Sequence, residues 1–235
     1  MENKNKKLKI IKNGPYITSG VLPLEKEIIV SDENGDSMGY KKEQKYDCPE
    51  GCAICRCGQS KNKPFCDGSH VQNSFDGTET AINGDYAGRC EKIKGPDLDL
   101  DDLSELCALA RFCHDQQSDV WSNTGQSDDP KAKKEAIRQA CLCPSGRLVA
   151  RDKNSGKAIE PELNQEIGLI EDPQKGVSGP IWLKGGVELE GADGKKYEIR
   201  NRMTLCRCGQ SKNKPFCDGA HIGCKFNDGD ESLKK

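Results

Sequence analysis

Cys55–His70 reads CRCGQSKNKPFCDGSH, and Cys206–His221 reads CRCGQSKNKPFCDGAH. Fifteen of the sixteen positions are identical, and the two copies differ only at Ser69 and Ala220. A repeated stretch of this length indicates that the 235-residue chain contains two copies of one structural unit.

The composition describes a chain of one to two domains with a small apolar core. Hydrophobic residues make up 34%, aromatic residues 5% and charged residues 31%, so we expect something besides apolar burial to stabilise the fold. The net charge of −2 gives no basic field for a nucleic-acid partner. No apolar run is long enough to cross a membrane, and no apolar stretch follows the basic residues 1–10 as a secretory signal requires. These features predict a soluble, cytoplasmic protein.

The fourteen cysteines need an explanation of their own. A secreted disulfide scaffold is one alternative, but the C-x-C and C-x2-C spacings suit chelation better than bridging. Cysteines that stay reduced in a cytosol are free to bind metal as thiolates. The pattern therefore favours metal binding over disulfides.

Each copy offers three cysteines and one histidine as metal ligands. In the first copy Cys55 and Cys57 form a bidentate corner, and Pro64 turns the chain back towards it. His70 follows Cys66 by four residues, so both can face the same ion from the first turn of a short helix. The equivalent set in the second copy is Cys206, Cys208, Cys217 and His221. Such a set suits a zinc ion or an iron–sulfur cluster with one histidine ligand, and ligand identity leaves both open.

The pattern C-x-C-x2-S-x3-P-x-C-D-G-S-H resembles the signature of the CDGSH iron–sulfur (NEET) family. Every signature position is present in the first copy, and Ala220 replaces the serine in the second. The resemblance implies two [2Fe–2S] clusters, one held by each ligand set. It also implies one-electron transfer or transfer of clusters, with a redox protein or an apo iron–sulfur protein as the partner.

The residues around the ligands suit an anionic cluster. We expect Ser60 and Ser211 to donate hydrogen bonds towards sulfur, and the helix after Asp67 to point its positive end at the cluster. Arg56 and Arg207, with the neighbouring lysines, are expected to ring each site with positive charge. The alternative for these cations is an ordinary solvated face.

The similarity between the two copies extends upstream. GPYITSGVLPLE at 14–25 resembles GPIWLKGGVELE at 179–190, so each unit should contain a few strands, the ligand loop and a short helix. One unit is too small to bury its own sheet, and single-motif family members resemble strand-exchanged homodimers. The duplication therefore predicts an α+β fold in which two β-rich modules form an internal pseudo-dimer and the chain is a monomer. Independent modules on a string are the alternative.

We divide the chain into a first CDGSH module at 1–84, a middle segment at 85–177 and a second CDGSH module at 178–235. In the middle segment, DLDLDDLSELCALARFC at 97–113 has leucines near helical spacing. DDPKAKKEAIRQACL at 128–142 predicts a second helix, with Asp128 or Asp129 as its cap and Pro130 at its first position. We expect a mainly helical segment that leads through a loop at 168–179 into the second module.

Cys107, Cys113 and the CPSG stretch at 143–146 resemble a divergent single-cluster ferredoxin-like domain that often accompanies CDGSH motifs. The resemblance implies a possible third iron–sulfur or metal site, whose candidate ligands are Cys90, Cys107, Cys113 and Cys143. Cys90, Cys141 and His114 compete for the fourth position. The alternative is that these cysteines are buried thiols. Cys48, Cys52 and Cys224 have no predicted role.

The sequence contains no nucleophile–base pair and no phosphate-binding loop, so we expect a carrier of electrons or clusters and no enzyme. The rival interpretation is a zinc-stapled interaction module. Both interpretations use the same eight ligands.

Overall fold

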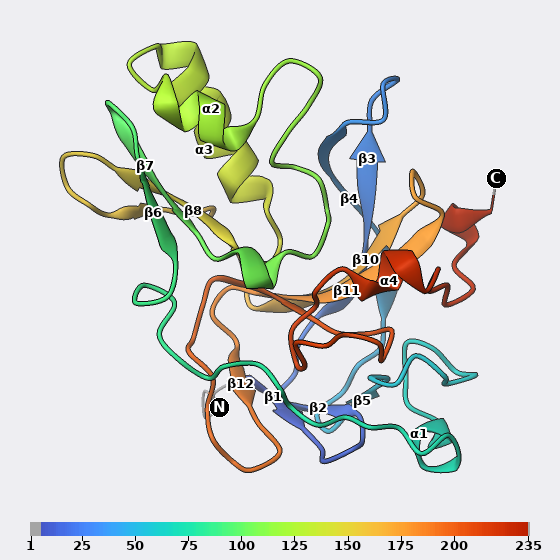
Figure 1. The fold of residues 1–235 in the computed structure, drawn as a ribbon. Helices are drawn as coiled ribbons and strands as arrows, with labels where there is room; N and C mark the ends of the chain where they lie inside the picture. The colour runs from blue at the N-terminus through green and yellow to red at the C-terminus, as the bar shows by residue number, and fades with distance from the viewer. Residues whose placement is uncertain (1–5, 235) are drawn as a thin grey trace.

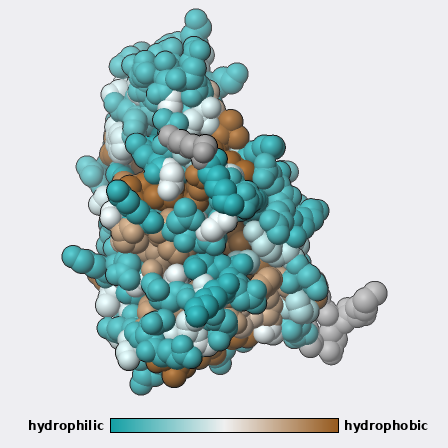
Figure 2. Space-filling view, turned by 90° about the vertical axis from the view of Figure 1, so that its right-hand side faces the viewer, coloured by the Kyte–Doolittle hydropathy of each residue, from teal (hydrophilic) through white to brown (hydrophobic). Residues whose placement is uncertain are grey.

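The structure is a computed structural model that describes residues 6–234. It is β-rich, with 31% strand and 14% helix, which agrees with the predicted α+β class. The basic start of the chain at 1–5 lies outside the described residues. No helix of the described part has the length and apolar character needed to cross a membrane. Figure 2 shows a largely hydrophilic face with apolar areas in patches, as expected from the high share of charged residues.

The first sheet has the strand order β12-β1-β2-β5 and lies at the bottom of Figure 1. Its strands are β12 (Glu188–Glu190), β1 (Lys7–Ile10), β2 (Tyr16–Ser19) and β5 (Ala53–Ile54). The pairs β1–β2 and β2–β5 are antiparallel, whereas β1 and β12 are parallel. The parallel strand β12 comes from the C-terminal half of the chain.

The second sheet repeats this arrangement with the halves reversed. Its order is β13-β11-β10-β3-β4, with β13 (Arg202–Leu205), β11 (Val177–Lys184), β10 (Glu166–Asp172), β3 (Leu24–Ser31) and β4 (Ser37–Tyr46). The pairs β11–β13 and β10–β11 are antiparallel, and β3 and β10 are parallel. Here the parallel strand β3 comes from the N-terminal half. Each sheet therefore contains strands from the other half of the chain: β12 in the first sheet, and β3 with its antiparallel neighbour β4 in the second.

One apolar core joins the two sheets. In the register, Leu8 lies opposite Leu189 and Ile167 lies opposite Leu24, and all four are at most 1% exposed. Their side chains belong to a single buried cluster with residues of both halves. Because apolar surface of each half is buried by the other, the alternative of independent modules is wrong.

The middle segment contains a third sheet and two helices, at the upper left of Figure 1. The antiparallel order is β6 (Glu91–Lys94), β7 (Leu98–Asp102), β8 (Leu148–Asp152) and β9 (Ala158–Ile159). The helices are α2 (Val120–Gly125) and α3 (Pro130–Leu142). The prediction for α3 is confirmed, since the Asp129 side chain caps it and Pro130 opens it. The prediction of a mainly helical segment is wrong.

The predicted helix at 97–113 is replaced by β7 and a short 3₁₀ helix, η1 (Ser104–Leu106). Leu98 and Leu100 alternate with aspartates and are both fully buried, which is the period-two pattern of a strand. The neighbouring strands neutralise these aspartates: Asp99 pairs with Lys94, and Asp101 pairs with Arg151.

The predicted loop at 168–179 is also wrong, because it contains most of β10 and the start of β11. All seven residues of β10 are buried, including its acidic ones. Distant cations neutralise them: Lys184 binds Glu166 at 2.6 Å, and Arg111 binds Asp172 at 2.5 Å. The acidic residues of this central strand therefore resemble those of a loop when the sequence is read without the distant cations.

Candidate metal centres

The two ligand loops have the same local structure. Each returns to the strand before it through an isolated bridge, Ile54 to Phe65 in the first and Leu205 to Phe216 in the second. Each leads into a four-residue helix, α1 (Ser69–Gln72) or α4 (Ala220–Gly223). In Figure 1, α1 lies at the lower edge of the molecule and α4 lies beside β10 and β11.

The loops bring the predicted ligands together in pairs. The two sulfurs of Cys55 and Cys57 are 3.8 Å apart, and Cys66 Sγ is 3.4 Å from His70 Nδ1. In the second copy the corresponding distances are 3.9 Å and 3.5 Å, for the pairs Cys206–Cys208 and Cys217–His221.

These distances agree with bonding of each pair to one tetrahedral metal. Metal–sulfur bonds of about 2.3 Å and metal–nitrogen bonds of about 2.0–2.1 Å place two sulfurs about 3.8 Å apart, and a sulfur and a nitrogen about 3.5 Å apart. Within residues 6–234, no three or more His, Cys, Asp or Glu side chains are grouped to hold a single ion. Each loop presents one Cys–Cys pair and one Cys–His pair, and this donor set fits a centre with two metals.

Burial favours the protonated thiol at two of the ligand cysteines. It raises the pKa of Cys57 to about 11 and also raises the pKa of Cys217. The Cys208 thiol hydrogen-bonds to Cys206 and lowers the pKa of Cys206 to about 7, against the opposing effect of burial. Because iron binds the thiolate, loading the sites must release protons.

The prediction for Ser60 and Ser211 is wrong. Ser60 Oγ donates to the carbonyl of Phe65 at 2.6 Å, and Ser211 Oγ donates to that of Phe216 at 2.7 Å. Both hydroxyls therefore close the loop, and their protons do not point at sulfur.

Backbone amides donate to the ligand sulfurs instead. The amide of Gln59 lies 3.4 Å from Cys57 Sγ, and the amide of Gly219 lies 3.4 Å from Cys217 Sγ. Hydrogen bonds of this kind stabilise negative charge on sulfur and tune reduction potential.

The helix after Asp67 also differs from its prediction, and Asp67 itself belongs to the loop. Its two carboxylate oxygens accept from the amides of Ser69 at 3.0 Å and Lys61 at 2.8 Å. The Ser69 side chain is the largest cause that holds the pKa of Asp67 below its ordinary value, and the two amides act in the same direction. The helix that follows begins after Gly68, without a side-chain cap, and spans one turn. Asp67 therefore stabilises the loop through its hydrogen bonds. A helix of one turn has only a small dipole, so its positive end contributes little at the cluster.

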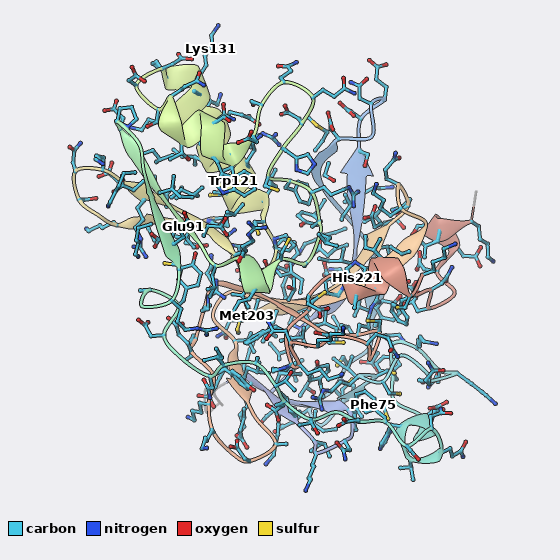
Figure 3. The ribbon with its side chains drawn as sticks, viewed as in Figure 1. Phe75, Glu91, Trp121, Lys131, Met203 and His221 are labelled. Carbon is cyan, nitrogen blue, oxygen red and sulfur yellow. The ribbon has the colours of Figure 1, made fainter. Side chains whose placement is uncertain are left out.

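The two arginines do not ring the sites with charge. Arg56 is 1% and Arg207 is 3% exposed. Arg56 donates to the carbonyl of Gly77 at 2.5 Å, and Arg207 pairs with Glu171 at 2.6 Å. Each guanidinium also stacks on a phenylalanine that follows its motif, Phe75 or Phe226; Phe75 is labelled in Figure 3. The arginines therefore anchor the chain after each motif.

The two loops contact each other through their backbones. A Cβ added to Gly58 would lie 2.6 Å from the carbonyl oxygen of Cys208, and one added to Gly209 would lie 2.5 Å from that of Cys57. The Tyr16 hydroxyl also donates to the carbonyl of Cys206 at 2.9 Å. Each glycine also has a positive φ, 75° at Gly58 and 78° at Gly209. The close contact and the backbone conformation therefore both require glycine at these two positions.

Three of the four middle-segment candidates lie together. Cys107, Cys113 and Cys143 line one cavity, and burial, with Cys143 and then Cys107, raises the pKa of Cys113 to about 11. Cys90 does not line this cavity, and its thiol donates to the carbonyl of Ala87. Among the competitors for a fourth position, His114 contacts a candidate ligand, with Nδ1 3.4 Å from Cys113 Sγ.

The remaining cysteines have other surroundings. Cys48 and Cys52 are buried in the core that joins the sheets, Cys141 donates to the carbonyl of Ile159 at 3.6 Å, and Cys224 is exposed. Of these four, Cys224 contacts a ligand residue, since its thiol donates to the carbonyl of His221 at 3.7 Å.

Family comparisons match three regions of the chain. Residues 13–71 and 178–222 match the family described as iron-binding zinc finger CDGSH type, and residues 93–153 match the divergent 4Fe-4S mono-cluster family. The human CDGSH iron-sulfur domain-containing protein 3, mitochondrial, is 35% identical over 83 residues, which are 35% of this chain and 56% of that protein. The chain thus spans about half the length of this curated relative. No solved structure matches the chain. The chain is an iron–sulfur protein in which two CDGSH-type regions flank a divergent 4Fe–4S mono-cluster region.

Proposed function

We propose that this protein carries two [2Fe–2S] clusters and passes electrons or clusters to protein partners. The observation that carries the proposal is the division of each ligand set into two pairs. Cys55 with Cys57 would bind one iron, and Cys66 with His70 would bind the other; the second copy offers the same pairs. A bound [2Fe–2S] cluster supplies one-electron redox chemistry. A single zinc ion would need all four ligands around one point.

The protein side chains would hold and tune the group. Amides of the loop donate to the ligand sulfurs, and burial of Cys55, Cys57, Cys206, Cys208 and Cys217 limits access of water. The two imidazoles must be neutral to bind. We infer a carrier and no enzyme, because the cysteine and histidine of each contacting pair would both be metal ligands and would leave no free thiol or imidazole to act as nucleophile or base.

We also infer that the two halves form an internal pseudo-dimer. The exchanged strands β3 and β12, the repeated strand order and the reciprocal contact at Gly58 and Gly209 support this. A redox protein or an apo iron–sulfur protein remains the expected partner. The human relative is named mitochondrial, and for this chain we retain the cytoplasm as the expected compartment.

A third iron–sulfur site in the middle segment is part of the proposal. Cys107, Cys113 and Cys143 line one cavity within the region that matches the mono-cluster family. His114 is our candidate for the fourth ligand because of its contact with Cys113.

Metal analysis of the purified chain tests the proposal. Two [2Fe–2S] sites require about four iron and four acid-labile sulfide per chain, and an additional four-iron site raises both to about eight. The purified protein should also be red-brown, with visible absorbance from the clusters. The variant Cys143→Ala should return the iron content to about four. A colourless chain with stoichiometric zinc and almost no iron would contradict the proposal.

A further inference from the structure

The two CDGSH-type sites are built alike but differ in exposure. Cys66 and His70 of the first site are partly exposed, whereas Cys217 and His221 of the second are each 3% exposed. Figure 3 shows His221 among side chains near the middle of the view. Because the motifs themselves are almost identical, the difference must come from what packs against the second copy.

The residue that packs there is Leu109 of the middle segment. A Cβ added to Gly219 would lie 2.5 Å from Leu109 Cδ1, so the leucine side chain rests on this glycine. At Gly68, the equivalent position of the first site, nothing lies within 4 Å of such a Cβ. Leu109 therefore fills a place that is open at the first site.

The segment 108–112 is fixed over the second site. Arg111 donates two hydrogen bonds, of 2.5 Å and 3.0 Å, to the buried carboxylate of Asp172. Phe112 is 3% exposed, and its ring packs on Tyr40 with centroids 4.7 Å apart. Leu109 and Arg111 both have positive φ, 55° and 65°, which residues other than glycine adopt only at an energetic cost. Such strain persists where the surroundings hold it and occurs most often at functional positions.

The ends of the same segment belong to the third candidate site. Cys107 and Cys113 flank residues 108–112 and line the cavity with Cys143. The middle segment also contacts the second ligand loop directly, since Asn213 Nδ2 donates to the carbonyl of Glu105 at 2.9 Å. The first ligand loop has no contact of this kind with the middle segment among the interactions of the described residues.

We propose that residues 108–112 are a fixed cover over the second CDGSH-type site, so that cluster exchange with an apo iron–sulfur protein takes place at the first site, beside His70. This rests on the proposed function, in which both sites hold clusters. During exchange, the donor thiolates and the imidazole release iron while the acceptor ligands bind it. Each acceptor thiol that binds releases a proton, and each donor thiolate that is freed takes one up. Solvent supplies or accepts the net difference in protons, and no oxidation state changes.

The cover itself is tested by hydrogen–deuterium exchange of the full chain. In Leu109→Gly, which removes the side chain and also suits the positive φ, amide exchange in 217–225 should accelerate at least about tenfold. Exchange in 66–74 should not change. Leu109→Met, which keeps an apolar side chain over Gly219, is the matched control and should behave as wild type. Unchanged exchange of 217–225 in Leu109→Gly would overturn the cover.

The consequence of the cover is tested by transfer to an apo plant-type ferredoxin, followed by absorbance and circular dichroism. The wild-type chain should give up one of its two CDGSH-type clusters rapidly, whereas Leu109→Gly should give up both. Equal rapid release of both clusters by the wild type would overturn the proposal. If the purified chain contains no iron, the proposed function fails, but the exchange experiment still decides whether the cover exists.

Discussion

At the scale of single residues, Gly209 is the position where the two ligand loops are least able to change. Its φ is +78°, and an added Cβ would lie 2.5 Å from the backbone oxygen of Cys57. In Gly209→Ala the positive φ alone costs about 1–2 kcal/mol, and the backbone contact adds to it, so cluster content should fall with stability. Gly51→Ala is the control, because Gly51 also has a positive φ of 81° but nothing within 4 Å of its added Cβ. Equal unfolding free energies of the two variants, measured by urea titration, would show that the loop contact is unimportant.

His221 makes the iron-free chain sensitive to acid. Burial, followed by the charge of Arg207, lowers its pKa to about 4, whereas an unfolded histidine titrates near 6.5. The unfolded chain therefore binds more protons between these values, so stability is fully present above about pH 6.5 and falls as the pH drops towards 4. The loss amounts to roughly 3 kcal/mol. Urea titrations of the iron-free chain at pH 7 and pH 5 should show about 2 kcal/mol of this loss, and His221→Asn should remove most of it. His70→Asn, in the more exposed site, is the matched control; a pH dependence that survives in His221→Asn would contradict the assignment.

The ligand residues could be named from the sequence because metal chemistry restricts them. Thiolates and an imidazole at fixed spacing, repeated at Cys55–His70 and Cys206–His221, leave few other uses. The hydroxyls of Ser60 and Ser211 differ from their prediction because a hydroxyl bonds whichever acceptor is nearest, and here that is a backbone carbonyl. Which acceptor is nearest depends on how the loop folds back, and spacing alone does not contain this.

At the scale of elements, a buried ion pair fastens the exchanged strand β3 to the second sheet. Lys184 of β11 binds Glu27 of β3 and Glu166 of β10, and both Lys184 and Glu27 are 2% exposed. Lys184→Met would leave Glu27 buried without its closest cation, at a cost of about 3–5 kcal/mol. Lys42→Met is the control, because the Lys42 side chain is 50% exposed although it also contacts Glu166, and it should cost less than about 1 kcal/mol. Thermal unfolding of the two variants decides; similar melting temperatures would show that the buried pair contributes little.

The elements that differ from their sequence-based prediction share one cause. Residues 97–113 place leucines at both helical and alternating spacing, and the strand β7 prevails because β6 and β8 supply cations for Asp99 and Asp101. In β10, Glu171 and Asp172 resemble loop residues until Arg207 and Arg111 are beside them. A local pattern cannot show a neutralising partner that lies far away in the sequence. Helix α3 was predictable because its cap and its first proline are local signals.

At the scale of the whole molecule, the duplication was readable from the repeated motif, but the inequality of the two sites was not. The cover depends on Leu109, which lies 110 residues before Gly219 in the sequence. No spacing rule connects these residues. The middle segment thus gives two nearly identical motifs different surroundings, and a chain of two equal modules would lack this difference.

The last prediction concerns assembly. The full chain should be monomeric, because β12 and β3 already supply within one chain the strand exchange that a homodimer would require. A fragment of residues 1–84 lacks β12 beside β1 and β10 beside β3, so it would expose two unpaired strand edges and half of the shared core. We expect this fragment to unfold or to dimerise by pairing with a second copy. Light scattering coupled to size-exclusion chromatography gives the mass of each, and visible absorbance shows whether the fragment retains its cluster. A fragment that stays monomeric, folded and coloured would show that the first CDGSH-type region needs no partner half, and the internal pseudo-dimer would have to be abandoned.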